Sequence, residues 1–410
     1  MLWLAGGPGC SGFHDSLSSG PSILKNGQLQ RNPFSLNNNA SILYIDQPVN
    51  TGLSYSSNII SSTVDAGKDV YGLLTAFFKK FPEYSTQDFH MAGPSYAGRY
   101  LPVFAHEILQ RKPQERNINL KSIMIGNGMV NQLVQSQSVY PMACGKGGYP
   151  SILTPEQCQP KTNETNLCKS AYDACWKFQD PAHCKFPEAS MDACYKPMQL
   201  YSEAGRSAYD VRKLCNSSES ACAPGFPETD AFVNRKSFLG AIGADTRSNR
   251  TFETCNSSMF SDFGKTGDGF MPYHTLLPDA LKEIQVLVYN GDADMLCNWL
   301  GSMAWAEELE WSGKSNYNQK QLQPFKLSNG TEVGQTKGAD GLTFLRIYGA
   351  SHGVTSDVPE VALQFYNKWF AAVHSNKRRV VDESMIPRKT NDIVDNGIEK
   401  LQGSIQVILL

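Results

Sequence analysis

One serine of the chain stands where the sequence favours a nucleophile. Ser95 lies in the stretch Gly-Pro-Ser-Tyr-Ala-Gly at residues 93–98, between an apolar run and a segment with helical spacing. Small residues around a serine let a strand turn sharply into a helix and lift the hydroxyl above the sheet edge. The second glycine stands one place later than in the Gly-x-Ser-x-Gly pattern. The alternative interpretation is an ordinary strand-to-helix turn with an exposed serine.

An acid and a histidine follow two other predicted strands. Asp294 comes after the apolar run 284–289, and His352 comes after the run 343–348. The carboxyl ends of parallel strands share one edge of a sheet, where ligand chemistry takes place. The order serine, acid, histidine is that of the α/β-hydrolases, in which the histidine takes the serine proton and the acid orients the imidazole. Asp292 is a competing candidate for the acid, and a plain turn carboxylate and loop histidine are the alternatives.

A glycine-rich loop near the start of the chain supplies the parts of an oxyanion hole. Gly7 lies in Gly-Gly-Pro-Gly at residues 6–9, and Tyr96 directly follows the candidate nucleophile. Two backbone N–H groups aimed at a tetrahedral oxyanion contribute about 2.7–4 kcal/mol each to transition-state stabilisation. A tight turn without a catalytic role is the alternative.

The elements that would position these residues alternate along the chain. Ser62 precedes an apolar pattern of helical spacing that ends at Pro82, and strands are predicted at 2–4, 41–46, 89–93, 122–125, 284–289 and 343–348. This alternation predicts an α/β fold, a mainly parallel, doubly wound sheet. The alternation of strands and helices stops after residue 129 and resumes at 272. We therefore expect a core formed by 1–129 and 272–374, with a disulfide-rich insertion at 130–271. A polar tail is expected at 375–410.

Composition limits the classes of partner. The 410 residues carry a net charge of −2 and are 41% hydrophobic. These values argue against nucleic acid or an anionic membrane surface as the main partner. No apolar run approaches the ~18 residues of a membrane span.

The cysteines and sequons indicate the secretory pathway. Eleven cysteines lack zinc-type spacing, which favours disulfides over a metal site, and their odd number leaves one thiol free. Six Asn-x-Ser/Thr sequons point the same way: Asn39, Asn163, Asn216, Asn249, Asn256 and Asn329. Because residues 1–5 contain no signal peptide, we expect that the chain lacks its natural beginning.

Several motifs together resemble the serine carboxypeptidases, an α/β-hydrolase family, across about residues 2–373. They are Trp-Leu-Ala-Gly-Gly-Pro-Gly-Cys-Ser at 3–11, Asp-Gln-Pro at 46–48, Ser-Tyr-Ala-Gly at 95–98, Ile-Gly-Asn-Gly at 125–128 and Gly-Asp-Ala-Asp at 291–294. The resemblance implies a catalytic triad of Ser95, Asp294 and His352, with Asp294 preferred over Asp292, and oxyanion donors at Gly7 and Tyr96. It also implies that the family's N-terminal strands are missing ahead of Trp3.

The resemblance further implies disulfides, a substrate site and a cellular setting. Cys297 would be the free thiol, near the active site, and the pairs would be Cys10–Cys255, Cys144–Cys158, Cys168–Cys194, Cys175–Cys184 and Cys215–Cys222. Substrate-binding positions would be Ala5, Gly6, Ser18, Pro94, Leu296, Cys297 and Gly353. The family implies no cofactor and no metal. We expect a monomer acting on a peptide or acyl substrate in a vacuole or outside the cell.

Three of these positions depart from the family pattern. Ala5 stands where the family has Asn, and Pro94 and Ser18 stand where it has Glu. By resemblance, those residues grip the C-terminal carboxylate of a peptide, and each lost hydrogen bond to a charged group costs ~1.5–3 kcal/mol. Gly353 replaces a bulky residue and widens the leaving-group pocket. The hypothesis is a serine carboxypeptidase acting through an acyl-enzyme. The alternatives are an esterase, amidase or acyltransferase with weakened carboxylate recognition, or a non-catalytic binding relative.

Overall fold

A twisted sheet of eight strands forms the centre of the computed structural model, which describes residues 1–215, 222, 225–244 and 250–375. The strand order is β4-β1-β5-β6-β7-β10-β9-β8, and the first six strands are parallel. Their bounds are β1 Leu2–Leu4, β4 Leu43–Ile45, β5 Phe89–Ser95, β6 Leu120–Gly128, β7 Gln285–Gly291, β8 Gln323–Lys326, β9 Glu332–Ala339 and β10 Leu342–Ile347. The predicted doubly wound sheet is thus confirmed, and each predicted strand is present.

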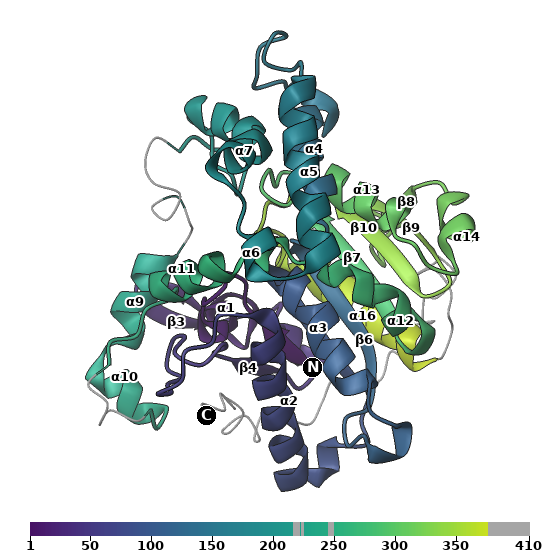
Figure 1. The fold of residues 1–410 in the computed structure, drawn as a ribbon. Coiled ribbons are helices and arrows are strands. Elements are labelled where there is room, and N and C mark those ends of the chain that lie inside the picture. Colours follow the sequence, from purple (N-terminus) through teal and green to yellow (C-terminus); the bar gives the residue numbers. More distant parts are fainter. Residues whose placement is uncertain (216–221, 223–224, 245–249, 376–410) are drawn as a thin grey trace.

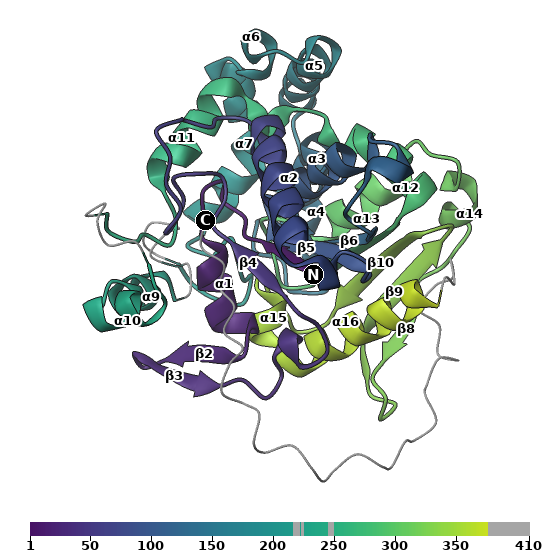
Figure 2. The same cartoon turned by 90° about the horizontal axis from the view of Figure 1, so that it is seen from below.

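Both faces of the sheet are buried, because alternate side chains of each strand enter different cores. In β7, Val286 and Val288 join the core beneath α2 (Thr63–Lys80) and α3 (Ala97–Leu109). Leu287 and Tyr289 join the opposite core, which Trp369 and its neighbours on α16 (Pro359–His374) complete. Figure 2 shows α16 (yellow) on the opposite side of the sheet from α2 and α3. Strands covered on both faces read as continuous apolar runs, which is why the sequence revealed them.

Local capping sets the start of the long helix α2. The Ser62 hydroxyl accepts a hydrogen bond from the Asp65 N–H, and Pro82 follows the last turn, in agreement with the predicted span. The other helices and short turns of the core are α1 Gly12–Ser19, α12 Leu277–Glu283, α13 Trp299–Glu308, α14 Lys314–Asn318, α15 Val354–Asp357, η1 Leu36–Asn38, η2 Pro82–Tyr84, η3 Pro113–Glu115 and η7 Tyr273–Leu276.

Four strands had no counterpart in the prediction. β9 and β8 extend the sheet in antiparallel fashion beyond β10, and β2 (Ser22–Lys25) pairs with β3 (Gln28–Arg31) in a separate hairpin. All residues of β3 are exposed, and β9 reads Glu-Val-Gly-Gln-Thr-Lys-Gly-Ala. Their polar and glycine-rich sequences lack the apolar runs by which the buried strands were recognised.

Between β6 and β7 the described residues form helices and turns and add no strand to the sheet. Figure 1 shows α5 and α7 (teal) standing away from the sheet, with α9, α10 and α11 to one side. The bounds are α4 Gln132–Pro141, η4 Met142–Lys146, α5 Thr162–Phe178, α6 Pro181–Cys184, α7 Glu188–Glu203, α9 Phe226–Val233, α10 Lys236–Ala241, α11 Ser257–Thr266 and η6 Asp268–Phe270. Within the described part of the chain, no helix has both the length and the apolar character needed to cross a bilayer. Of the predicted tail, only Ser375 lies among the described residues.

Candidate active site

Ser95 ends β5 at the carboxyl edge of the sheet. Its φ of +61° lies in the left-handed region, which a non-glycine residue adopts at a cost, as in the sharp turn of a nucleophile elbow. A side chain at Gly93 would come within 2.2 Å of the Leu4 carbonyl oxygen, and one at Gly98 would come within 2.6 Å of the Met129 carbonyl oxygen. Both glycines are therefore needed for close packing of the turn, although the second stands one place late.

The acid and the histidine are joined at the same edge. The His352 Nδ1 atom lies 2.8 Å from the Asp294 Oδ2 atom, and Asp294 is fully buried. The carboxylate accepts this hydrogen bond, so the proton sits on Nδ1 and Nε2 is left as the base. The His352 N–H donates to the Tyr209 carbonyl oxygen at 3.0 Å, which holds the loop that carries the ring.

Three further donors surround the Asp294 carboxylate. The Asn127 side-chain amide donates to Oδ2 at 2.7 Å, and the backbone N–H groups of Leu296 and Cys297 donate at 3.0 and 3.3 Å. Together with the His352 ring, these donors give both oxygens of the buried carboxylate a hydrogen-bond partner. The sequence marked Asn127 only as part of a glycine-bracketed motif. Its φ of +38° explains the motif, because β6 turns there in a conformation that glycine and asparagine tolerate best.

The charge on Asp294 sets the pKa of the histidine. Burial lowers the pKa of His352, but the adjacent Asp294 carboxylate and the nearby Asp15 raise it, and the net direction is upward. The imidazole is therefore a stronger base than a free histidine. Within the described residues no hydrogen bond links Ser95 to His352. Such catalytic bonds are often long in the free enzyme and tighten when substrate binds.

The glycine loop lies directly against Ser95. A side chain at Gly6 would come within 2.6 Å of the Ser95 Cβ atom and 3.0 Å of its Oγ atom. Gly7 has a φ of +112°, a conformation that glycine adopts readily. The predicted oxyanion donor Tyr96 directly follows Ser95 and is the N-cap of α3. The structure thus brings the loop and the nucleophile turn together.

The competing acid Asp292 has different partners. Its Oδ1 atom accepts hydrogen bonds from the Tyr149 hydroxyl at 2.8 Å and from the Gly349 N–H at 2.9 Å, while Arg346 approaches Oδ2 at 3.3 Å. These contacts tie the loop after η4 to the ends of β7 and β10. The hydrogen bond to His352 belongs to Asp294.

Sequence comparison identifies the family. The sequence model of serine carboxypeptidase matches residues 1–372. The chain belongs to the serine carboxypeptidase family. It is therefore a hydrolase, a serine-type carboxypeptidase, as the motifs predicted.

Relatives and a solved structure agree with the family assignment. Carboxypeptidase Y homolog A from Sclerotinia sclerotiorum is 45% identical over 371 residues, which are 90% of this chain and 67% of the relative. The homolog from Arthroderma gypseum is 45% identical over 375 residues, covering 90% and 68%. A prohormone-processing carboxypeptidase from Saccharomyces cerevisiae superposes with a TM-score of 0.75 at 24% identity, covering 93% of this chain and 84% of that one. This likeness confirms the α/β-hydrolase fold.

The three positions predicted to depart from the family pattern lie on or directly after three elements, β1, β5 and α1. Ala5 is buried after β1, and Pro94 directly precedes Ser95 in β5. The Ser18 hydroxyl donates to the Asp15 carbonyl oxygen at 2.9 Å, within α1. Neither Ala5 nor Pro94 has a side-chain donor, and the Ser18 hydroxyl is already used within its own helix.

The other predicted substrate positions surround the triad. Leu296 and Cys297 contact Asp294 through their N–H groups, and a side chain at Gly353 would meet only Ser356, at 3.8 Å. Cys297 is buried and is the free cysteine among the described residues. Burial raises the pKa of its thiol well above the usual value, so it stays protonated. One ligand atom from each of Asp294, Cys297 and His352 lies within 4.8 Å of the others, and Asp294 and His352 are already joined by their hydrogen bond.

One carboxyl group, that of Asp15, was not identified from the sequence. Asp15, on α1, accepts a hydrogen bond from the Trp3 indole N–H at 2.7 Å. Burial raises the pKa of Asp15 to about 6, against the lowering effects of that hydrogen bond and of His352. α1 packs against α15, which begins just after His352. The only signal in the sequence is an acid in the first turn of a short helix, which is a common capping feature.

The cysteines pair as the family resemblance implied. The structure holds Cys10–Cys255, Cys144–Cys158, Cys168–Cys194, Cys175–Cys184 and Cys215–Cys222. Among the sequons, Asn39, Asn163 and Asn329 are exposed, and Asn216 and Asn249 lie outside the described residues. The Asn256 side chain instead accepts hydrogen bonds from the first turn of α11 and donates to the Asn50 carbonyl oxygen at 2.9 Å.

Proposed function

We propose that the carboxypeptidase reaction runs through an acyl-enzyme on Ser95. The Ser95 hydroxyl attacks the carbonyl carbon of the last peptide bond while His352 Nε2 takes its proton. His352 then gives that proton to the leaving amine, and the C-terminal residue departs. Water attacks the acyl-enzyme by the same route and restores Ser95. The observation that carries this proposal is the hydrogen bond from His352 to the buried Asp294, at the sheet edge where β5 ends in Ser95.

Gly7 and Tyr96 act in each tetrahedral intermediate. Their N–H groups stabilise the negative oxygen that forms beside Ser95, with Gly6 giving the loop its close approach. Four hydrogen-bond donors hold the Asp294 carboxylate in place beside the imidazolium, which it stabilises.

Recognition of the C-terminal carboxylate is proposed to be weakened. Ala5, Pro94 and Ser18 replace the amide and the two acids that the family uses for this purpose, and none of them presents a free side-chain donor to a substrate. Acyl transfer chemistry does not depend on those side chains. Esters and amides are therefore expected to react at rates comparable to those of peptide acids.

A secretory setting and a monomeric state complete the proposal. Five disulfides are stable in oxidising compartments, and the exposed Asn39, Asn163 and Asn329 are accessible for glycosylation. A vacuole or the cell exterior fits this chemistry.

Labelling with an organophosphate tests the proposed nucleophile. The protein is treated with the reagent and the adduct is mapped by mass spectrometry, in parallel with His352→Ala. One label on Ser95, lost or strongly slowed in the variant, is the expected result. Absence of label on Ser95, or equal labelling of the variant, would contradict the mechanism and favour a non-catalytic binding protein.

A further inference from the structure

A buried aspartate lies on the far side of the nucleophile turn, outside the triad. Asp268 begins η6, within the segment between β6 and β7, and is 1% exposed. Its Oδ1 atom accepts hydrogen bonds from the Thr63 N–H at 2.8 Å and from the Tyr273 hydroxyl at 2.6 Å. Its Oδ2 atom accepts from the Thr63 hydroxyl at 2.6 Å and from the Tyr96 hydroxyl at 2.5 Å. One carboxylate thus joins α2, η7 and the residue after the nucleophile.

A residue of α3 also binds the main chain of the turn that contains Asp268. Arg99, buried three residues after Tyr96, donates from Nη2 to the carbonyl oxygens of Asp268 (2.7 Å) and Met271. Its guanidinium also lies over the rings of Tyr96 and Tyr273, at 5.8 and 5.0 Å from their centroids. Both the side chain and the backbone of Asp268 are therefore bound to the element that starts at the nucleophile.

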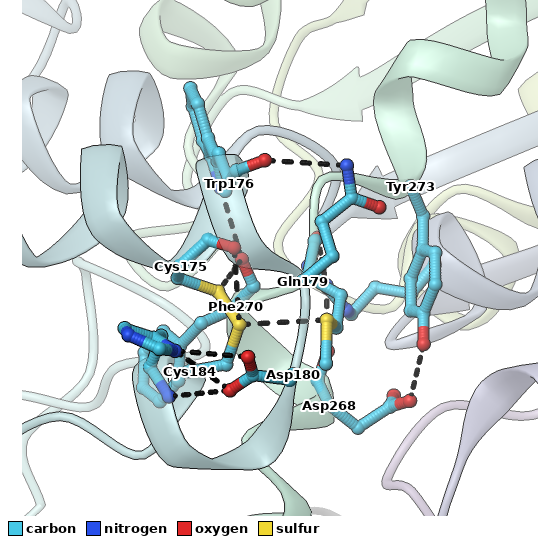
Figure 3. The surroundings of a disulfide bond; sticks show 11 residues. Cys175, Trp176, Gln179, Asp180, Cys184, Asp268, Phe270 and Tyr273 are labelled. Atoms are coloured by element: carbon cyan, nitrogen blue, oxygen red, sulfur yellow. Dashed lines mark hydrogen bonds and ion pairs between the residues drawn. A yellow bond between two sulfur atoms is a disulfide. The ribbon is translucent and has the colours of Figure 1, made fainter.

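The disulfide-rich segment fixes the turn from its other side. Figure 3 shows the Cys175–Cys184 bridge beside Phe270, with the Tyr273 hydroxyl directed at Asp268. The Trp176 indole N–H donates to the Phe270 carbonyl oxygen at 3.0 Å. A side chain at Gly267 would come within 2.3 Å of the Cys184 carbonyl oxygen, so the bridge packs tightly against the residue before Asp268.

These contacts restrict how Tyr96 can move. Its phenol cannot leave Asp268 without leaving a buried hydroxyl unpaired and removing one of the four donors to the buried carboxylate, which costs ~1–3 kcal/mol. Its ring also packs edge-on against Tyr100 and Phe263, at centroid distances of 5.2 and 6.0 Å. Because the ring is fixed, the backbone of Tyr96 is fixed with it, and that backbone carries the N–H beside Ser95.

We propose that Asp268 is a positioning residue of the oxyanion hole, which holds the Tyr96 side chain so that the Tyr96 N–H points at the oxyanion. The proposal rests on the proposed role of Ser95 and Tyr96 in catalysis. Asp268 touches no reacting atom and acts through Tyr96. A displacement of about 1 Å in a catalytic group can cost on the order of a hundredfold in rate.

The test compares two variants with a matched control. Tyr96→Phe and Asp268→Asn break the phenol–carboxylate bond from either end. Tyr149→Phe breaks the equivalent bond between a phenol and the buried Asp292. Steady-state kcat and KM are measured with a peptide substrate, together with the affinity of a peptide aldehyde, whose adduct with Ser95 places an oxyanion in the hole.

We expect kcat to fall about tenfold in Tyr96→Phe and up to about a hundredfold in Asp268→Asn, with KM changed less than about twofold. Aldehyde affinity falls by the same factor as kcat, and Tyr149→Phe leaves both within about twofold of wild type. A folded Tyr96→Phe with wild-type kcat and aldehyde affinity overturns the proposal, even if Asp268→Asn does not fold. Equal losses in Tyr149→Phe overturn it as well. Failure of the wild-type protein to label at Ser95 would instead refute the proposed mechanism itself.

Discussion

The two sides of Ser95 differ in how far they follow the serine carboxypeptidase pattern. On the side of β7 and β10, Asp294 is surrounded by four hydrogen-bond donors, and His352 is held by its ring and by its backbone. On the side of β1, α1 and the residue before Ser95, the positions that we propose for carboxylate recognition hold Ala5, Ser18 and Pro94. Under the proposed function, the groups for acyl transfer are all present, while the family's hold on the C-terminal residue is reduced.

In the proposed function, catalysis and recognition depend on different side chains, although Pro94 and Ser95 share strand β5. Loss of a triad hydrogen bond would leave a buried charge unpaired, which is costly for the fold as well as for the reaction. A substitution at a proposed recognition position leaves the hydrogen bonds of Asp294 and His352 in place. The recognition side can therefore change without disturbing the chemistry.

The largest expected effect separates two aspartates that stand two residues apart. Asp294→Asn should lower kcat by about 10⁴, because the amide no longer stabilises the imidazolium or fixes its tautomer. Asp292→Asn should lower the melting temperature but keep kcat within about tenfold of wild type, since it loses only structural hydrogen bonds. Steady-state kinetics and calorimetry on both variants check this. A comparable loss of kcat in Asp292→Asn would contradict the assignment.

A second prediction concerns a variant that restores the family's recognition side chains at two positions. The double variant Ala5→Asn, Pro94→Glu should raise kcat/KM for a blocked dipeptide acid by about ten- to a hundredfold, the equivalent of ~1.5–3 kcal/mol. The value for the matching dipeptide amide should not change. Ala5→Asn with Pro94→Ala is the control, because it removes the proline without adding a carboxyl. Equal gains for acid and amide would show that the proline limits catalysis itself.

The smallest expected effect concerns Asp15, the carboxyl that remains on the recognition side. Its pKa is raised to about 6 in the folded protein, so the folded state binds a proton more tightly than the unfolded state. Its stability contribution is therefore complete below about pH 4 and is lost as the pH rises through 6. Asp15→Asn should unfold at higher urea concentration at pH 7.5, by about 1–3 kcal/mol, and show almost no gain at pH 4.

The exposed Asp65 provides a control of opposite sign. Hydrogen bonds from Lys68 and Ser62 lower the pKa of Asp65, so Asp65→Asn should lose stability at pH 7.5 and lose less as the pH falls toward 3. Urea unfolding of both variants at several pH values is the measurement. A gain for Asp15→Asn that is larger at pH 4 than at pH 7.5 would show that its carboxylate is stabilised by charge rather than penalised by burial.

Sequence reasoning reached the parts of the molecule that have strong local signals. Buried parallel strands appear as apolar runs, and Ser95, Asp294 and His352 follow three of them, so sheet topology brings these residues to one edge. The Asp268 contacts could not be predicted in this way. They join Thr63, Tyr96 and Tyr273, which lie far apart in the chain, and a lone aspartate in a loop carries no periodic pattern.

The polar strands and Asp15 were missed for related reasons. β8 and β9 lack the apolar runs of the central strands, so their pairing beyond β10 depends on tertiary context. Asp15 reads as a common first-turn acid, and only the fold places the Trp3 indole against it. The sequence shows which family residues are replaced at the recognition positions. The burial of Asp15 depends on three-dimensional packing, which the sequence does not show.

The most direct test of the difference between the two sides is a substrate comparison on the unmodified protein. Rates of release are measured for a blocked dipeptide acid and for its amide from pH 4 to pH 8. We predict that kcat/KM for the acid stays within about tenfold of that for the amide over the whole range, because the carboxylate donors are absent. A strong preference for the acid at low pH would contradict the claim that recognition is weakened while the catalytic chemistry is complete.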